Sequence, residues 1–228
     1  MFLGLGAVAL AGLSIVPETG ARTTHATAEP TAARSARLPI PAAAATLAAF
    51  AANGLFAGLA GLFLAATLHH PSHALSDAAL FLVFSCGVLS QLMTAGLPAS
   101  RVLALGTLYM LAGLVLLVVS VRLSNPNLAV FLIGGALIGG GAGAVFKGTT
   151  GIVLAASAPQ NRLTMTSDLL IALYVGLSVP VVGAGIALNQ GASAPNTVCG
   201  FAILVGLGVT VSGWALLGRP ARGSELAA

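Results

Sequence analysis

Composition places this chain in a membrane. It has 228 residues, of which 57% are hydrophobic and 6% are charged, and its mean hydropathy is +1.03. A water-soluble domain carries about a quarter charged residues, so nine basic and five acidic side chains are too few to solvate a globule of this length. The basic residues occur singly at the ends of apolar runs, with no basic patch interleaved with aromatics, which excludes nucleic acid as a partner. The lipid bilayer is therefore the expected solvent and partner.

Six apolar runs are long enough to cross that bilayer. A spanning helix needs about 20 predominantly apolar residues, because about 30 Å of hydrocarbon is crossed at about 1.5 Å per residue. Backbone amides in lipid must be satisfied within helices or a closed barrel, and strand-like alternation is absent from this sequence. We therefore predict an all-α membrane protein, with a six-helix transmembrane bundle over residues 39–218. The expected helices cover residues 40–68, 77–96, 102–121, 128–156, 169–188 and 197–217.

The first 38 residues differ from the rest. Residues 1–16 are apolar but short, which fits either a secretory signal or part of a membrane helix. No Lys or Arg precedes Arg22, and no small-residue cleavage site directly follows the run, which favours a partial transmembrane helix. Residues 17–38 are polar and are expected to form a linker, and residues 219–228 a polar tail.

The basic residues of the loops predict an orientation, because cytoplasmic loops carry the excess of Lys and Arg. One side of the membrane receives most of the arginines, and the other receives Arg122 together with His69, His70 and His73. We predict a multi-pass protein of the cell (plasma) membrane, with the 17–38 linker and the C-terminus in the cytoplasm. The arginines on the expected cytoplasmic side are Arg22, Arg34, Arg37, Arg101, Arg162, Arg219 and Arg222.

Four passages resemble the C-terminal half of a major facilitator superfamily transporter, in particular a bacterial efflux-type member. Residues 16–19, Val-Pro-Glu-Thr, resemble the end of the family's sixth helix. Residues 96–101, Gly-Leu-Pro-Ala-Ser-Arg, resemble the loop between its eighth and ninth helices, although the family's acidic and second basic residues are missing there. The glycine-rich run 134–151 resembles the tenth helix. Residues 167–185, with Tyr174 and Leu-Ser-Val-Pro-Val-Val over 177–182, are similar to the eleventh.

The resemblance implies a secondary transporter that moves a small solute by alternating access. Such proteins have two six-helix halves with the substrate site between them near the midplane. This chain would supply only the second half, which implies either a separate N-terminal six-helix half as a partner or a truncated gene product. The few polar groups in the spans favour an amphipathic or weakly anionic solute. The alternative function is a non-catalytic membrane scaffold or a defunct transporter fragment.

Six residues are candidates for substrate binding or gating, and Lys147 is the most prominent because it lies deep in a predicted span. Two interpretations of it remain open: a functional cation in the membrane, or a long side chain that snorkels to the cytoplasmic interface. Asp168 is expected to cap the start of the next helix. The other five candidates are Asn53, Gln91, Tyr174, Ser178 and Pro180.

These five have different expected roles. The amides of Asn53 and Gln91 either line a cavity or bond a neighbouring helix. Tyr174 and Ser178 are one helical turn apart and share a face. Pro180 removes one helical hydrogen bond and so allows a bend.

Other features of the sequence exclude several functions. The glycines at 135, 139 and 143 form two overlapping GxxxG spacings, which predict close helix packing. They do not form a phosphate-binding loop, because Gly148 rather than Ser or Thr follows Lys147. The histidines near residue 70 lack a carboxylate or thiol at ligand spacing, so no metal is expected. With no paired carboxylates, HExxH or GxSxG motif, we expect neither an enzyme nor a cofactor.

Overall fold

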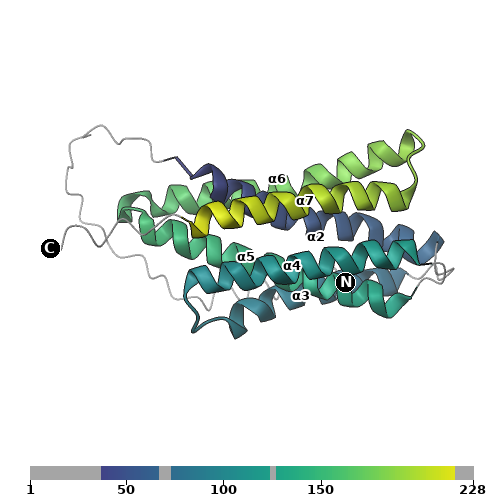
Figure 1. Ribbon diagram of the computed structural model, residues 1–228, viewed down its shortest axis with the longest axis horizontal. Helices are drawn as coiled ribbons and strands as arrows, with labels where there is room; N and C mark the ends of the chain where they lie inside the picture. Colours follow the sequence, from purple (N-terminus) through teal and green to yellow (C-terminus); the bar gives the residue numbers. More distant parts are fainter. Residues whose placement is uncertain (1–36, 67–72, 124–126, 219–228) are drawn as a thin grey trace, which may run out of the picture. The chain divides into compact units, whose positions relative to one another are not determined.

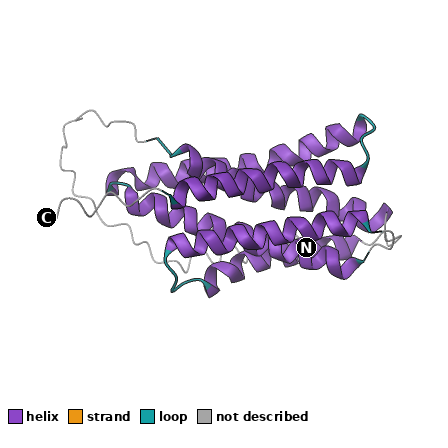
Figure 2. Ribbon diagram, viewed as in Figure 1, coloured by secondary structure: helices purple, strands orange, loops and turns teal. Residues whose placement is uncertain are grey.

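The computed structural model describes residues 37–66, 73–123 and 127–218, and in this part of the chain the regular elements are all helices (Figure 2). The predicted partial helix 1–16, almost all of the linker 17–38 and the tail 219–228 lie outside the described residues. The elements are α2 (Ile40–Ala66), α3 (His73–Met93), α4 (Ala99–Arg122), α5 (Leu128–Ala156), the short 3-10 helix η1 (Pro159–Asn161), α6 (Arg162–Asn189) and α7 (Ala194–Leu217).

Six of these helices are long and apolar enough to span a membrane, as the sequence predicted. The expected bounds of the central helices are close to the observed ones, and α5 has the predicted ends. Four helices begin earlier than predicted: α4 and α7 by three residues each, α3 at His73 instead of Asp77, and α6 at Arg162 instead of Leu169. The physical reason is that an apolar run marks only the part of a helix that lies in lipid. The polar first turns of α3 and α6 continue the helix beyond it.

The expectation that Asp168 caps a helix is wrong. Asp168 lies in the second turn of α6, which starts at Arg162 with Asn161 at the cap position. Thr166, beside it, donates its hydroxyl to the Arg162 carbonyl in the manner of an interior helical residue. A cap needs extended backbone just before the first turn, and here that turn is formed by the residues that follow the Pro159 3-10 turn.

Two helices form the centre of the bundle, α2 and α5 (Figure 1). Of the apolar span in each, 67% of α2 and 61% of α5 are buried, against 11% of α3. α2 packs on α6 and α7, whereas α5 packs on α3 and α4. The two central helices also contact each other, and α4 contacts α7.

Small residues at intervals of seven bring α4 and α5 together. Gly106 and Gly113 on α4 face Gly141 and Gly134 on α5. A Cβ added at Gly141 would lie 2.7 Å from the Met110 amide nitrogen and 2.9 Å from the Gly106 carbonyl oxygen. Side chains at these positions would force the helices apart, so the glycines permit close backbone contact over most of their length.

A second glycine face of α5 packs against α3, and similar contacts join α2 to α6. A Cβ at Gly139 would collide with the Val83 carbonyl, and one at Gly143 with the Gly87 carbonyl, both on α3. The GxxxG spacings therefore mark a close helix contact, as predicted. On the other side of the bundle, Gly54 of α2 meets the Leu177 carbonyl of α6 in the same way.

The helix contacts relate the two halves of the bundle by an approximate exchange, in which the α4–α5 contact is much more extensive than its counterpart α2–α7. The exchange replaces α2 by α5, α3 by α6 and α4 by α7, and the reverse. Under it, the α2–α6 contact becomes the α5–α3 contact, and the α2–α7 contact becomes the α5–α4 contact. The α2–α5 and α4–α7 contacts map onto themselves. Three spans are an odd number, so the second three-helix unit starts at the opposite face of the membrane from the first. An inverted repeat requires this topology.

The two ends of the bundle differ in charge. One end, here called the basic end, holds the start of α2, the α3–α4 turn and the α5–α6 connection, with Arg37, Arg101 and Arg162. The other, the Arg122 end, holds the last residue of α4 and the start of α7. There the Arg122 Nη2 donates to the Asn196 Oδ1 over 3.2 Å.

Candidate functional site

Lys147, a cation in the interior of α5, reaches across to the end of α3. Its Nζ donates to the Gln91 carbonyl oxygen over 2.5 Å and to the Thr94 Oγ1 over 3.3 Å. α3 ends at Met93, so Gln91 contributes one of the last carbonyls, which have no partner within an α-helix. The C-terminal end of a helix carries partial negative charge and attracts cations. The half-buried ammonium is therefore held by the end of α3.

This geometry bears on both interpretations of Lys147. The side chain extends toward the basic end of the bundle, as snorkelling requires. Its ammonium, however, contacts oxygen atoms of the protein at the end of α3. Its described partners are a carbonyl and a hydroxyl, and neither of them is a carboxylate. Asp168 is not among its described contacts.

Gln91 takes part through its backbone. The sequence directed attention to the side-chain amide, yet the atom that meets Lys147 is the main-chain carbonyl oxygen. The Thr94 hydroxyl, buried beside it, donates to the Ser90 carbonyl over 2.7 Å and so has an oxygen lone pair available for the ammonium.

Four buried polar side-chain atoms, two on α2 and two on α5, have no hydrogen-bond partner among the described residues. They are the Thr46 Oγ1 and Asn53 Oδ1 on α2, and the Thr149 and Thr150 Oγ1 atoms on α5. Thr46 and Thr149 are fully buried, and Asn53 is 4% exposed. A buried polar group that lacks a hydrogen-bond partner costs about 1–3 kcal/mol. These groups therefore destabilise the fold unless a ligand supplies their hydrogen bonds.

Eight other hydroxyls in or beside the helices behave differently. They donate to a carbonyl three or four residues earlier, which is the ordinary way to satisfy a hydroxyl in an apolar helix. The contrast sets Thr46, Thr149 and Thr150 apart from these eight. The hydroxyls that make this local bond are those of Ser90, Thr94, Thr107, Ser120, Ser157, Thr166, Thr197 and Thr210.

An aromatic pair locates the polar groups relative to one another. The rings of Phe50 on α2 and Phe146 on α5 meet edge to face, with centroids 5.8 Å apart. Thr46 lies one turn from Phe50, and Thr150 one turn from Phe146. Because α2 and α5 run in opposite directions, both threonines lie on the basic-end side of the aromatic pair. Asn53 lies on its other side, at the midpoint of α2.

These residues form one candidate site at the contact of the two central helices. We call it the α2–α5 junction, and it consists of Thr46, Phe50, Asn53, Phe146, Thr149 and Thr150. The sequence prediction found only Asn53. The signal that was available is the spacing of seven between Thr46 and Asn53, which places both on one face of α2. Single threonines in apolar runs are too common to stand out.

The candidates on α6 are not part of the junction. Tyr174 is 65% exposed and Ser178 is also exposed, so they share an outward face as predicted, while Pro180 is buried. Pro180 lies inside a helix that continues through it. One turn before it, Gly176 packs against the Leu47 carbonyl of α2.

A metal site is not found in the described part of the chain, where no group of three or more His, Cys, Asp or Glu side chains comes together. His69 and His70 lie outside the described residues, and His73 is the first residue of α3.

Comparison with protein-family models, curated proteins and solved structures gives no match. The chain's own residues and fold therefore carry any functional conclusion.

Proposed function

We propose that this chain moves a small solute across the membrane by alternating access, as a secondary transporter. The observation that carries the proposal is the exchange relation between the two three-helix units. Inverted repeats are a recurring architecture of secondary transporters, whose substrate sites lie near the midplane at the interface of the repeats. The α2–α5 junction is our candidate for that site, because α2 and α5 correspond in the exchange of the two units and Asn53 lies halfway along α2.

The junction has the chemistry of a solute site. It combines an aromatic pair with hydroxyls and an amide that have no partner among the described residues. Binding sites for small molecules are mostly apolar, with a few polar groups that fix orientation. Such a lining suits an amphipathic solute. Lys147, next to Phe146 in sequence, supplies a positive charge on the same helix and favours a weakly anionic solute.

The remaining parts of the proposal come from the resemblance to the major facilitator superfamily. We propose that this chain corresponds to the C-terminal half of an efflux-type member and works with an N-terminal six-helix half. An ion gradient or the solute's own gradient would supply the energy, since the sequence contains no ATP-binding motif.

A non-catalytic membrane scaffold is the second candidate, and one observation favours it. The Lys147 ammonium is engaged in a structural contact with the end of α3, which leaves it less available to a solute.

Vesicle flux separates the two candidates. The full chain is reconstituted alone and with a co-expressed N-terminal six-helix half, and release of carboxyfluorescein and of ethidium is followed. We expect faster release of at least one probe than from empty vesicles in the paired preparation, and a loss of that increase in Asn53→Leu. Release equal to that of empty vesicles in both preparations would reject transport of these probe classes and favour the scaffold.

A further inference from the structure

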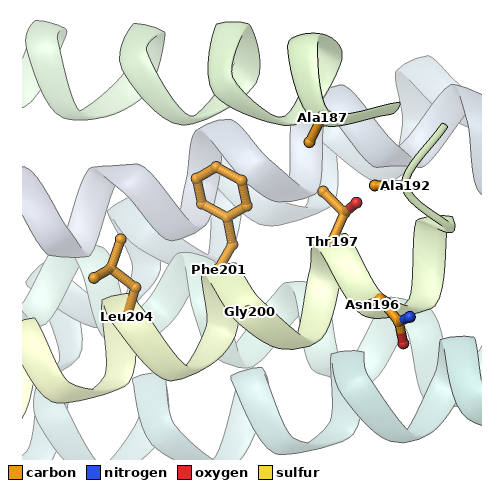
Figure 3. Close-up of a pocket in the computed structure, with 7 residues that line it drawn as sticks. All are labelled: Ala187, Ala192, Asn196, Thr197, Gly200, Phe201 and Leu204. Carbon is orange, nitrogen blue, oxygen red and sulfur yellow. The ribbon is translucent and has the colours of Figure 1, made fainter. Parts of the chain in front are cut away.

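A cleft of about 340 Å³ opens between α6 and α7 at the Arg122 end. Ala187 of α6 and Ala192 of the connecting turn form one side (Figure 3). The first turns of α7 form the other, where Thr197 and Phe201 point toward α6 and Asn196 points away from it (Figure 3). Gly200 and Leu204 complete the lining, which is almost entirely apolar.

Small residues keep this cleft open. A Cβ added at Gly185 of α6 or at Gly200 of α7 would meet no atom within 4 Å, in contrast to the glycines that pack α4 on α5. The Phe201 ring bridges the two helices here, with its Cζ 3.1 Å from the Cβ position of Gly183. Leu204 is 67% exposed, so the cleft is open to the lipid side.

Hydrogen-bond donors lie at the Asn196 end of the cleft, here called its mouth, on the side of α7 that faces Arg122 of α4 (Figure 3). The Arg122 guanidinium donates to the Asn196 Oδ1, and a guanidinium has four further N–H groups. The Asn196 carboxamide adds two more donors. α7 begins here after Ser193, which makes no side-chain cap bond. The N-terminal amides of α7 and the positive end of its dipole therefore lie at the same end of the bundle as the Arg122 donors.

No carboxylate balances these donors within the described residues. The two acidic side chains in that part of the chain are Asp77 on α3, which is not packed on α7, and Asp168 near the basic end of α6. The positive charge at the mouth therefore favours an anion, and the apolar lining of the cleft favours a hydrocarbon chain.

We propose that this cleft binds an anionic phospholipid, with its phosphate on Arg122 and Asn196 and one acyl chain along Gly200 and Leu204. From Asn196 to Leu204 the helix runs about 12 Å, at about 1.5 Å per residue. α7 runs here from the end of the bundle toward its middle, as a lipid does from its headgroup to its acyl chain. Arginine pairs with phosphate through two parallel hydrogen bonds. A bound lipid would link α4, α6 and α7, and the proposal does not depend on transport.

Native mass spectrometry of the full chain in mild detergent tests the proposal, with phosphatidylglycerol and phosphatidylcholine added separately. We expect phosphatidylglycerol to bind about tenfold more tightly to the wild type. Arg122→Gln should remove that preference, whereas Arg101→Gln, at the basic end, should keep it. Gly200→Leu places a side chain in the cleft from a position whose Cβ meets no atom within 4 Å, and should weaken binding of both lipids by severalfold.

The proposal is overturned by any of three results. Arg122→Gln could keep the preference, Arg101→Gln could lose it equally, or Gly200→Leu could bind both lipids as the wild type does. Thermal unfolding of each variant confirms that it is folded. Gly200→Leu replaces a helical glycine with a better helix former, so a fold defect is not expected from it.

Discussion

The Nζ atom of Lys147 lies 2.5 Å from the carbonyl oxygen of Gln91 and so joins the inner helix α5 to the end of the outer helix α3. α3 is the least buried of the spans and is held chiefly by α5. Its contacts there are the glycines at 139 and 143 and this ammonium. A charge within a span is costly, and here part of that cost is offset by carbonyl and hydroxyl oxygens at a negative helix end.

Lys147→Met should therefore destabilise the protein. A hydrogen bond to a charged group contributes about 1.5–3 kcal/mol, and methionine keeps the apolar stem without the ammonium. We expect the free energy of unfolding to fall by about 1–2 kcal/mol, measured by denaturation in mixed micelles. Thr94→Val removes the 3.3 Å contact and the hydroxyl's own bond to the Ser90 carbonyl, but it leaves the Lys147 contact with the Gln91 carbonyl, so it should cost less. Equal stability of Lys147→Met and the wild type would show that the contact does not stabilise the bundle.

Alanine at Gly141 should destabilise the bundle, because its Cβ would lie 2.7 Å from the Met110 amide nitrogen. Overpacking of this kind costs about 1–3 kcal/mol, and the neighbouring backbone has little freedom to move. Gly185→Ala is the matched control, since a Cβ there meets no atom within 4 Å. It should be neutral or stabilising by up to about 1 kcal/mol through helix propensity. If both variants unfold at the wild-type temperature, α4 and α5 are not in backbone contact.

The glycine run shows how far the sequence could predict the packing. The spacing of four at 135, 139 and 143 correctly predicted a close helix contact. It did not identify the partner, because small residues also recur on α2, α4 and α6. The spacing of seven at 134, 141 and 148, matched by 99, 106 and 113 on α4, was also legible in the sequence and was missed. Pairing of distant helices depends on shape at both surfaces, which one sequence run does not specify.

The site was less predictable than the fold. A charge in an apolar run is rare, so Lys147 stood out, but its partner is a main-chain carbonyl, which every residue carries. Thr46 and Thr149 differ from other threonines only in lacking the usual local hydrogen bond, a property of the folded chain. The start of α6 at Arg162 escaped notice because hydropathy marks lipid contact and not helix ends.

Thr46→Val tests whether the α2–α5 junction has a use beyond packing. Valine has nearly the same shape as threonine and removes a hydroxyl that is fully buried and has no partner among the described residues. Stability should stay equal or rise by about 1 kcal/mol, while solute flux should fall severalfold. Thr210→Val is the control, because that hydroxyl is exposed on α7 and donates to the Gly206 carbonyl. Unchanged flux in Thr46→Val would remove this hydroxyl from the proposed site.

Labelling in intact cells tests the orientation that the arginines predict. Among the described residues, Arg37, Arg101 and Arg162 lie at the basic end, which should face the cytoplasm. In a background of Cys86→Ala and Cys199→Ala, we expect Ser193→Cys to react with a membrane-impermeant maleimide in intact cells. Ser100→Cys should react only after permeabilisation, since both positions are exposed but lie at opposite ends. The cysteine-free background serves as the blank, and reaction of Ser100→Cys in intact cells would reverse the orientation.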